Sequence, residues 1–325
     1  MKGVGWVRLA AGMLLLRHSD PTPLSSYTII LLYFAENDMT DERIKTELVC
    51  FLMVAGLALN ICAEESHKPF VTGEVSASFV NKVLSYGLVD GDEPLFLPSG
   101  SLTFFGWYSA GAIFYMDMTD YGRTVGRGDR SWDFWEIDFP TELRHAFGPE
   151  DAAWLPTTVE LGAGYRYEYH PPRSHYHDTQ FWTFDVSLSD LWLVPTFAYE
   201  RDTINDNGTY LNLSVCHEFP LCETVTLTPV LAQGFGDAKR VRGYLTDDDG
   251  DPLDHAGLMD TSVGFDLAWR PYDGLEVSAF VRYNEFLFDR EIRRASRHYI
   301  ADAAGHPVSD TSWHFTGGIS VSYMF

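Results

Sequence analysis

The sequence has no apolar run long enough to cross a membrane as a helix, which would require about 20 residues. Its longest apolar block covers residues 49–59 and is preceded by Leu48. Basic residues are also scarce: 23 Lys and Arg stand against 46 Asp and Glu, giving a net charge of −23. Phosphate backbones repel so acidic a chain, and we expect no nucleic-acid partner. Cysteine is rare too, with 4 residues, of which only Cys216 and Cys222 lie beyond residue 63.

The amino-terminal region has the features of a targeting segment. Residues 48–59 provide the apolar core of a signal peptide, and residues 60–63 provide a cleavage site before Glu64. We therefore predict a signal peptide at 39–63, with Met39 as the start of translation. Residues 1–38 are expected to be an upstream extension outside the fold, although residues 1–16 offer a second, weaker signal. Residues 64–325 are then the folded protein.

Residues 311–325 alternate strictly between apolar and polar side chains. The apolar face has aromatic residues at both ends and consists of Trp313, Phe315, Gly317, Ile319, Val321, Tyr323 and Phe325. This pattern predicts a strand with one polar face, and terminal aromatic residues are typical of strands that cross a bilayer. The alternative is the last strand of a soluble sandwich. The positions Ile319, Val321, Tyr323 and Phe325 resemble the C-terminal assembly signal of bacterial outer-membrane β-barrels, which implies the barrel-assembly machinery as a partner.

The same alternation recurs along the chain from Val71. We predict twelve strands, at 71–86, 95–105, 107–119, 131–145, 157–170, 178–189, 192–202, 208–218, 223–235, 259–271, 275–289 and 311–325. Short and long connections alternate, with exceptions at 148–156 and 203–207. Even strand number and alternating connections are typical of a membrane barrel. The predicted fold is all-β: a single closed antiparallel transmembrane β-barrel of about 12 strands, with short periplasmic turns and longer extracellular loops.

Charges of both signs recur on one face in the middle of the predicted strands. A charged side chain facing lipid at mid-depth costs about 2–4 kcal/mol, so this face should line the lumen. The predicted pore-lining residues are Glu136, Asp138, Glu160, Arg166, Glu168, Asp185, Glu200, Asp266 and Arg282. They could order water and sort solutes by charge. Alternatively, they could pair with one another as a structural plug, and we favour a narrow, partly plugged lumen.

Residues 71–118 resemble the start of the TorF-type porins, a family of small bacterial outer-membrane barrels. The shared features are residues 81–87 (Asn-Lys-Val-Leu-Ser-Tyr-Gly), the loop 90–94 (Asp-Gly-Asp-Glu-Pro) and the turn 105–108 (Phe-Gly-Trp-Tyr). The sequence departs from the family pattern at Val83, where the family has an aromatic residue, and at Tyr86, where it has Arg. Residues 135–138 and the terminal strand also look similar. The resemblance implies a twelve-stranded barrel with porin activity.

The predicted function is passive diffusion of small cationic or neutral solutes through the outer membrane of a Gram-negative bacterium, with membrane lipid and small solutes as partners. A structural or adhesive barrel is the alternative, and an outer-membrane hydrolase is a further one. No Ser-His-acid constellation stands out, so we expect no enzyme activity. The acidic run 247–251 lacks calcium-loop spacing, and His170, His175 and His177 lie in a predicted loop. We therefore expect no metal and no cofactor.

Cys216 and Cys222 flank Phe219 and Pro220. If the chain folds back about residue 219, the two cysteines oppose each other on neighbouring strands. An opposed antiparallel pair has Cα atoms about 4.5 Å apart, within the range of a disulfide. We therefore predict a disulfide between them, formed in an oxidising compartment.

Overall fold

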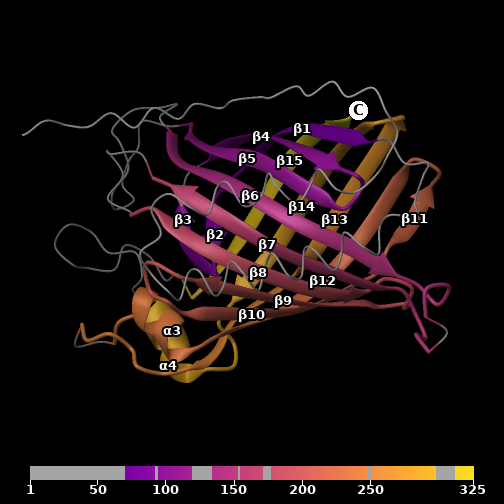
Figure 1. The fold of residues 1–325 in the computed structure, drawn as a ribbon. Helices are drawn as coiled ribbons and strands as arrows, with labels where there is room; N and C mark the ends of the chain where they lie inside the picture. Colours follow the sequence, from indigo (N-terminus) through magenta and orange to yellow (C-terminus); the bar gives the residue numbers. More distant parts are fainter. Residues whose placement is uncertain are drawn as a thin grey trace, which may run out of the picture. The chain divides into compact units, whose positions relative to one another are not determined.

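The computed structural model describes residues 70–91, 94–118, 134–152, 154–170, 177–247, 250–297 and 312–325. These residues form a closed antiparallel barrel (Figure 1). Its twelve strands are β1 (Val71–Val80), β4 (Leu95–Phe104), β5 (Tyr108–Asp117), β6 (Phe134–Phe147), β7 (Val159–Tyr169), β8 (Thr179–Leu188), β9 (Val194–Asp202), β10 (Thr209–Cys216), β12 (Val225–Gly236), β13 (Gly257–Tyr272), β14 (Leu275–Glu285) and β15 (Trp313–Met324). The predicted fold class is confirmed. The predicted segments 1–38 and 39–63 lie outside the described residues.

The barrel closes where the first strand meets the last. β1 pairs with β15, and Phe79 lies opposite Ile319. β10 pairs with β12, which completes the ring on the other side. Closure pairs each of the twelve barrel strands on both sides, so their backbone groups bond within the sheet, as a bilayer interior requires.

The outer face of the barrel is apolar and the inner face is polar. Large hydrophobic side chains exposed on the outside include Val75, Phe79, Leu102, Phe139, Phe184, Phe197, Leu213, Leu231, Val263, Phe265, Leu267, Val281, Phe315, Ile319 and Val321. Their immediate neighbours along the strands point inward: Ser78, for example, donates a hydrogen bond to Ser320 across the β1–β15 pair at 2.8 Å. An apolar exterior of this extent is stable only against lipid.

The longest connections of the barrel lie at one of its two ends. The turn between β13 and β14 and the turn between β4 and β5 are tight, whereas the connections 237–256 and 286–312 at the other end are long. We call this second end the long-loop end. It carries two short helices, α3 (Ala238–Tyr244) and α4 (Arg290–Ser296). No helix in the described part of the chain is long and apolar enough to span a membrane.

The first predicted strand, 71–86, is too long. β1 ends at Val80, and the chain then forms a separate hairpin of β2 (Val83–Ser85) and β3 (Leu88–Gly91). Tyr86 and Gly87 connect its strands with φ of 56° and 81°. Two successive positive φ values define the type I′ turn of a tight hairpin, which suits Gly at the second position.

The predicted disulfide is not formed, because Cys216 and Cys222 are both free. The short strand β11 (Phe219–Cys222) does not fold back on β10 but continues its line along the same edge of β12. Cys216 lies opposite Val230 and Cys222 opposite Val225, five positions apart on β12. At about 3.4 Å per residue this separation is far beyond disulfide range. The chain reverses at residues 223–224, not at 219–220.

Candidate functional site in the barrel lumen

The β2–β3 hairpin crosses the lumen. It connects β1 to β4, and its tip reaches β9, which lies six strands from β1 and five from β4 in the ring of twelve, on the opposite side of the barrel. There the Tyr86 hydroxyl donates a short hydrogen bond to Oε1 of Glu200. The Tyr86 ring also packs on Tyr210 of β10, with ring centroids 4.9 Å apart. The hairpin thus ties two opposite walls of the barrel together.

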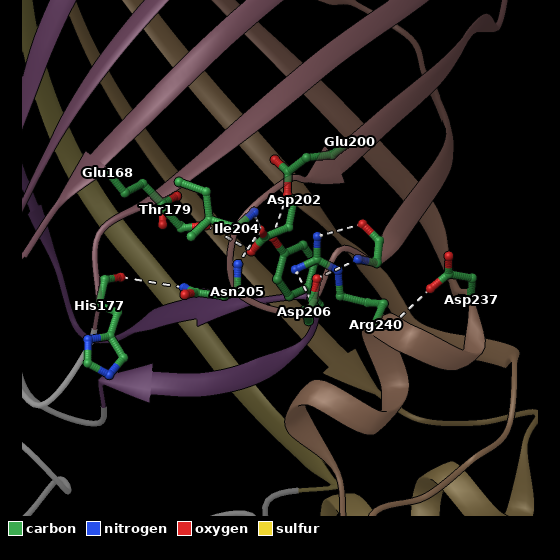
Figure 2. Close-up of polar contacts among 12 residues, drawn as sticks. Glu168, His177, Thr179, Glu200, Asp202, Ile204, Asn205, Asp206, Asp237 and Arg240 are labelled. Carbon is green, nitrogen blue, oxygen red and sulfur yellow. Dashed lines mark hydrogen bonds and ion pairs between the residues drawn. The ribbon is translucent and has the colours of Figure 1, made fainter. Parts of the chain in front are cut away.

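The hairpin tip is locked from the long-loop end by Arg240 of α3. This side chain is completely buried, and its guanidinium lies over the Tyr86 ring, 4.2 Å from the ring centroid. Its Nη1 lies 3.2 Å from Oδ2 of Asp206, and its Nη2 donates to the carbonyl of Gly208 at 3.3 Å. Figure 2 shows Arg240 directed from α3 toward the turn that contains Asp206. A buried guanidinium held by a carboxylate and by aromatic rings is stably charged.

Two pKa shifts agree with this arrangement. Burial, followed by the neighbouring Glu200 carboxylate, raises the pKa of Tyr86 well above its ordinary value, so the hydroxyl stays protonated and donates a hydrogen bond to Glu200. Burial alone would lower the pKa of Arg240, but Tyr86, Tyr244 and Asp206 raise it overall. Tyr86 and Tyr244 also pack against a small hydrophobic core, which consists of Leu88, Val241, Leu245, Met259, Phe286, Ile292 and Ala295.

A polar cavity of about 300 Å³ lies beside the hairpin. It is lined by inward-facing residues of six strands, β5 to β10, together with Val83, Leu84, Ser85 and Tyr86 of the hairpin. Four carboxylates face it, those of Glu136, Asp138, Glu168 and Glu200, along with the guanidinium of Arg166. Arg166 bonds Glu168 and Glu200 at 2.9 Å each and lies 4.0 Å from Asp138. Negative charge therefore exceeds positive charge around this cavity.

A second group of charges lies further toward the end of the barrel opposite the long-loop end. Arg144 of β6 bonds Glu142 at 2.6 Å and reaches across β7 to Asp185 of β8 at 3.0 Å. Gly162 of β7 makes this bridge possible, because a Cβ at that position would lie 2.2 Å from Oδ1 of Asp185. On the other side of the barrel, both carboxylate oxygens of Asp266 accept hydrogen bonds from Nη2 of Arg282 at 2.6 Å.

The nine residues that the sequence predicts to line the pore all lie on the inward face of their strands. Five of them, Glu136, Asp138, Arg166, Glu168 and Glu200, surround the cavity. Asp185, Asp266 and Arg282 belong to the other ion pairs, and Glu160 lies two positions before Gly162 on β7. Much of the lumen charge is therefore paired across strands.

Sequence reasoning missed Arg144, Glu142, Tyr86 and Arg240. Arg144 and Glu142 carry a signal that could have found them, since they share strand parity with Asp138. Arg240 has none, because nothing in the local sequence indicates that an arginine in a long loop is buried. In the sequence, Tyr86 is marked only by its departure from the TorF-type pattern.

The predicted assembly signal lies at the seam of the barrel. Ile319, Val321 and Tyr323 of β15 and the following Phe325 all face outward and are at least 45% exposed. The Phe325 backbone exchanges two hydrogen bonds with Gly73 of β1, at 2.8 and 2.9 Å. Of the predicted loop histidines, His170 instead lines the cavity and His177 is exposed, and His175 lies outside the described residues.

A closed twelve-stranded antiparallel barrel with an apolar exterior and a charged interior is an outer-membrane β-barrel, a class of protein of the bacterial outer membrane. No family model matches the chain, and no curated protein does either.

Among solved structures the chain is similar to OmpT, an outer membrane protein of Vibrio cholerae (12% identity, 81% of this chain and 100% of that chain, TM-score 0.33). It is also similar to OccAB2 of Acinetobacter baumannii (10% identity, 81% and 66%, TM-score 0.36). A third match is the translocator domain of the autotransporter NalP from Neisseria meningitidis (9% identity, 86% and 98%, TM-score 0.35). At such low identities and TM-scores these similarities do not extend to function.

Proposed function

We propose that this barrel is a narrow porin of the TorF type that lets small cationic or neutral solutes diffuse across the outer membrane. The observation that carries the proposal is the cavity in which four carboxylates face a single guanidinium on the inner wall of a closed barrel. An excess of negative charge along a water-accessible path favours cations over anions. The hairpin across the lumen narrows this path, so low conductance is expected.

A structural barrel without transport is the second candidate. The specific observation in its favour is the lock of Tyr86 by Glu200, Arg240 and Tyr210, which holds the hairpin across the lumen. In either case the apolar exterior associates with membrane lipid. We also propose that the barrel-assembly machinery recognises the outward side chains at the end of β15. The proposal includes no catalytic activity, and a lipid-hydrolysis assay on the purified protein tests that part.

Single-channel recording in planar bilayers separates the two candidates. A salt gradient should give a reversal potential of the sign for cation preference. The double variant Glu136→Gln/Glu168→Gln should reduce that preference, whereas Glu291→Gln, which removes an exposed carboxylate of α4, should not. Anion preference would refute the cation pore. Absence of conductance at every voltage would favour the structural barrel.

A further inference from the structure

Three side chains of metal-ligand type meet at the long-loop end of β6 and β7. One ligand atom each from Glu136, Glu168 and His170 lies within 4.8 Å of the other two. The strand register explains the meeting: Asp138 lies opposite Glu168, and Ile137 lies opposite Tyr169. One further step of the same register sets Glu136 opposite His170. Because alternate residues share a face, the three side chains point into the lumen together.

A buried carboxylate oxygen without a hydrogen-bond partner in the described part of the chain lies beside them. Asp138 is 2% exposed, and within the described part of the chain its Oδ1 has no hydrogen-bond partner. Its Oδ2 is near two donors, the Tyr115 hydroxyl at 3.3 Å and Nε of Arg166 at 4.0 Å. Asp138 lines the same cavity as the three metal-ligand side chains. Leaving such an oxygen unsatisfied costs free energy, which a cation or its bound water would recover.

The backbone at His170 is fixed, although β7 ends at Tyr169. Its N–H donates to Oδ1 of Asp178 at 2.9 Å, and Oδ2 of the same carboxylate accepts from the Tyr167 hydroxyl at 2.7 Å. Asp178 therefore clamps the chain directly after the strand. This clamp holds the imidazole at the position where it extends the inward row of carboxylates.

We propose that Glu136, Glu168 and His170 form a site for a divalent first-row transition metal ion such as Zn²⁺, with Asp138 holding a water bound to the metal. One imidazole with two carboxylates suits such ions better than Ca²⁺, which takes only oxygen ligands. Zinc–ligand bonds are about 2.0–2.2 Å long, so small side-chain rotations must draw the three ligand atoms together. The excess negative charge of the cavity assists binding, and the site requires no solute transport.

The test is a calorimetric titration of Zn²⁺ into the purified, tag-free full chain in detergent, with thiols alkylated beforehand because Cys216 and Cys222 are free. Saturable binding of one ion per barrel is expected. Glu136→Gln and His170→Ala should each weaken it at least tenfold, and Asp138→Asn should weaken it about tenfold or more, as loss of a supporting group does. His255→Asn and Asp254→Asn, which alter a histidine and a carboxylate outside the cavity, should leave it unchanged.

A measurement on the unmodified sequence guards against variants that fail to fold. Zn²⁺ should protect His170 from modification by diethylpyrocarbonate, detected by peptide mass spectrometry. Three results would overturn the site: no saturable binding, binding that persists in both ligand variants, or no protection of His170. Equilibrium binding is read without any conductance, so a barrel that fails to conduct would leave this inference intact.

Discussion

Replacing Tyr86 with alanine should release the β2–β3 hairpin from the opposite wall of the barrel. The substitution removes the hydrogen bond to Glu200, the contact with the Arg240 guanidinium at 4.2 Å, and ring contacts with Tyr210 and Tyr244 at 4.9 and 5.4 Å. Typical contributions are about 1.5–3 kcal/mol for a hydrogen bond to a charged group, and about 0.5–2 kcal/mol for a cation–π contact or an aromatic pair. The positive φ at residue 86 is retained by alanine, so its cost does not change.

Because such terms are not additive, the low end of each range gives the safer total, about 3 kcal/mol. That corresponds to roughly a hundredfold shift in the equilibrium between the locked and released hairpin. Hydrogen–deuterium exchange of the β2 and β3 amides should therefore accelerate about a hundredfold in Tyr86→Ala, and single channels should conduct more. The barrel strands should keep their protection.

Tyr272→Ala is the matched control, because Tyr272 is 76% exposed at the end of β13 and its loss should leave the hairpin unaffected. If hairpin exchange in Tyr86→Ala stays within about threefold of the parent protein, the energetic reasoning is wrong. The hairpin would then be held by the small hydrophobic core around Leu88, and the Tyr86 contacts would contribute little.

Three further predictions concern the lumen and the long-loop end. Gly162→Val should break the ion pair between Arg144 and Asp185 and lower the stability of the barrel by about 1–3 kcal/mol. Heat-modifiable gel mobility should show this loss as a lower unfolding temperature. Gly100→Val is the control and should cost less, because a Cβ at that position has room. Arg282→Gln should leave that unfolding temperature nearly unchanged, because the partner Asp266 is 38% exposed and such pairs contribute about 1 kcal/mol or less. The same substitution should increase the preference of the channel for cations. A shift toward anions would contradict the position of Arg282 in the lumen. The hydrogen bond between His255 and Asp289 raises the pKa of His255 above 6.5. Burial alone would raise the pKa of Asp289, but His255 and the backbone N–H groups of α4 lower it below 3.8. The pair therefore stabilises α4 fully between pH 3.8 and 6.5 and less outside that window. After correction for the intrinsic exchange rate, hydrogen exchange of the α4 amides should be slower at about pH 5.5 than at pH 8. His255→Asn should abolish this difference.

The sequence by itself determined the barrel. Strand alternation is a local, period-two property, so it could be read without knowing which strands meet, and it indicated which residues of β7 and β13 share a face. The number of strands and the end that carries the longest connections followed from the same local pattern. The residues predicted to line the pore lie on the inward face because side-chain direction in a strand is fixed by parity.

Only the tertiary structure decided what fills the barrel. The hairpin tip at Tyr86 contacts Glu200 and Arg240, which are more than 100 residues away in the chain, and no periodicity records such a contact. The failed disulfide has the same origin: parity allowed Cys216 to oppose Cys222, but β11 continues β10 along one edge of β12, and register is set by pairing with a third strand. Local patterns fix the direction of a side chain, whereas its partner depends on closure of the barrel and on where the long connections fold back.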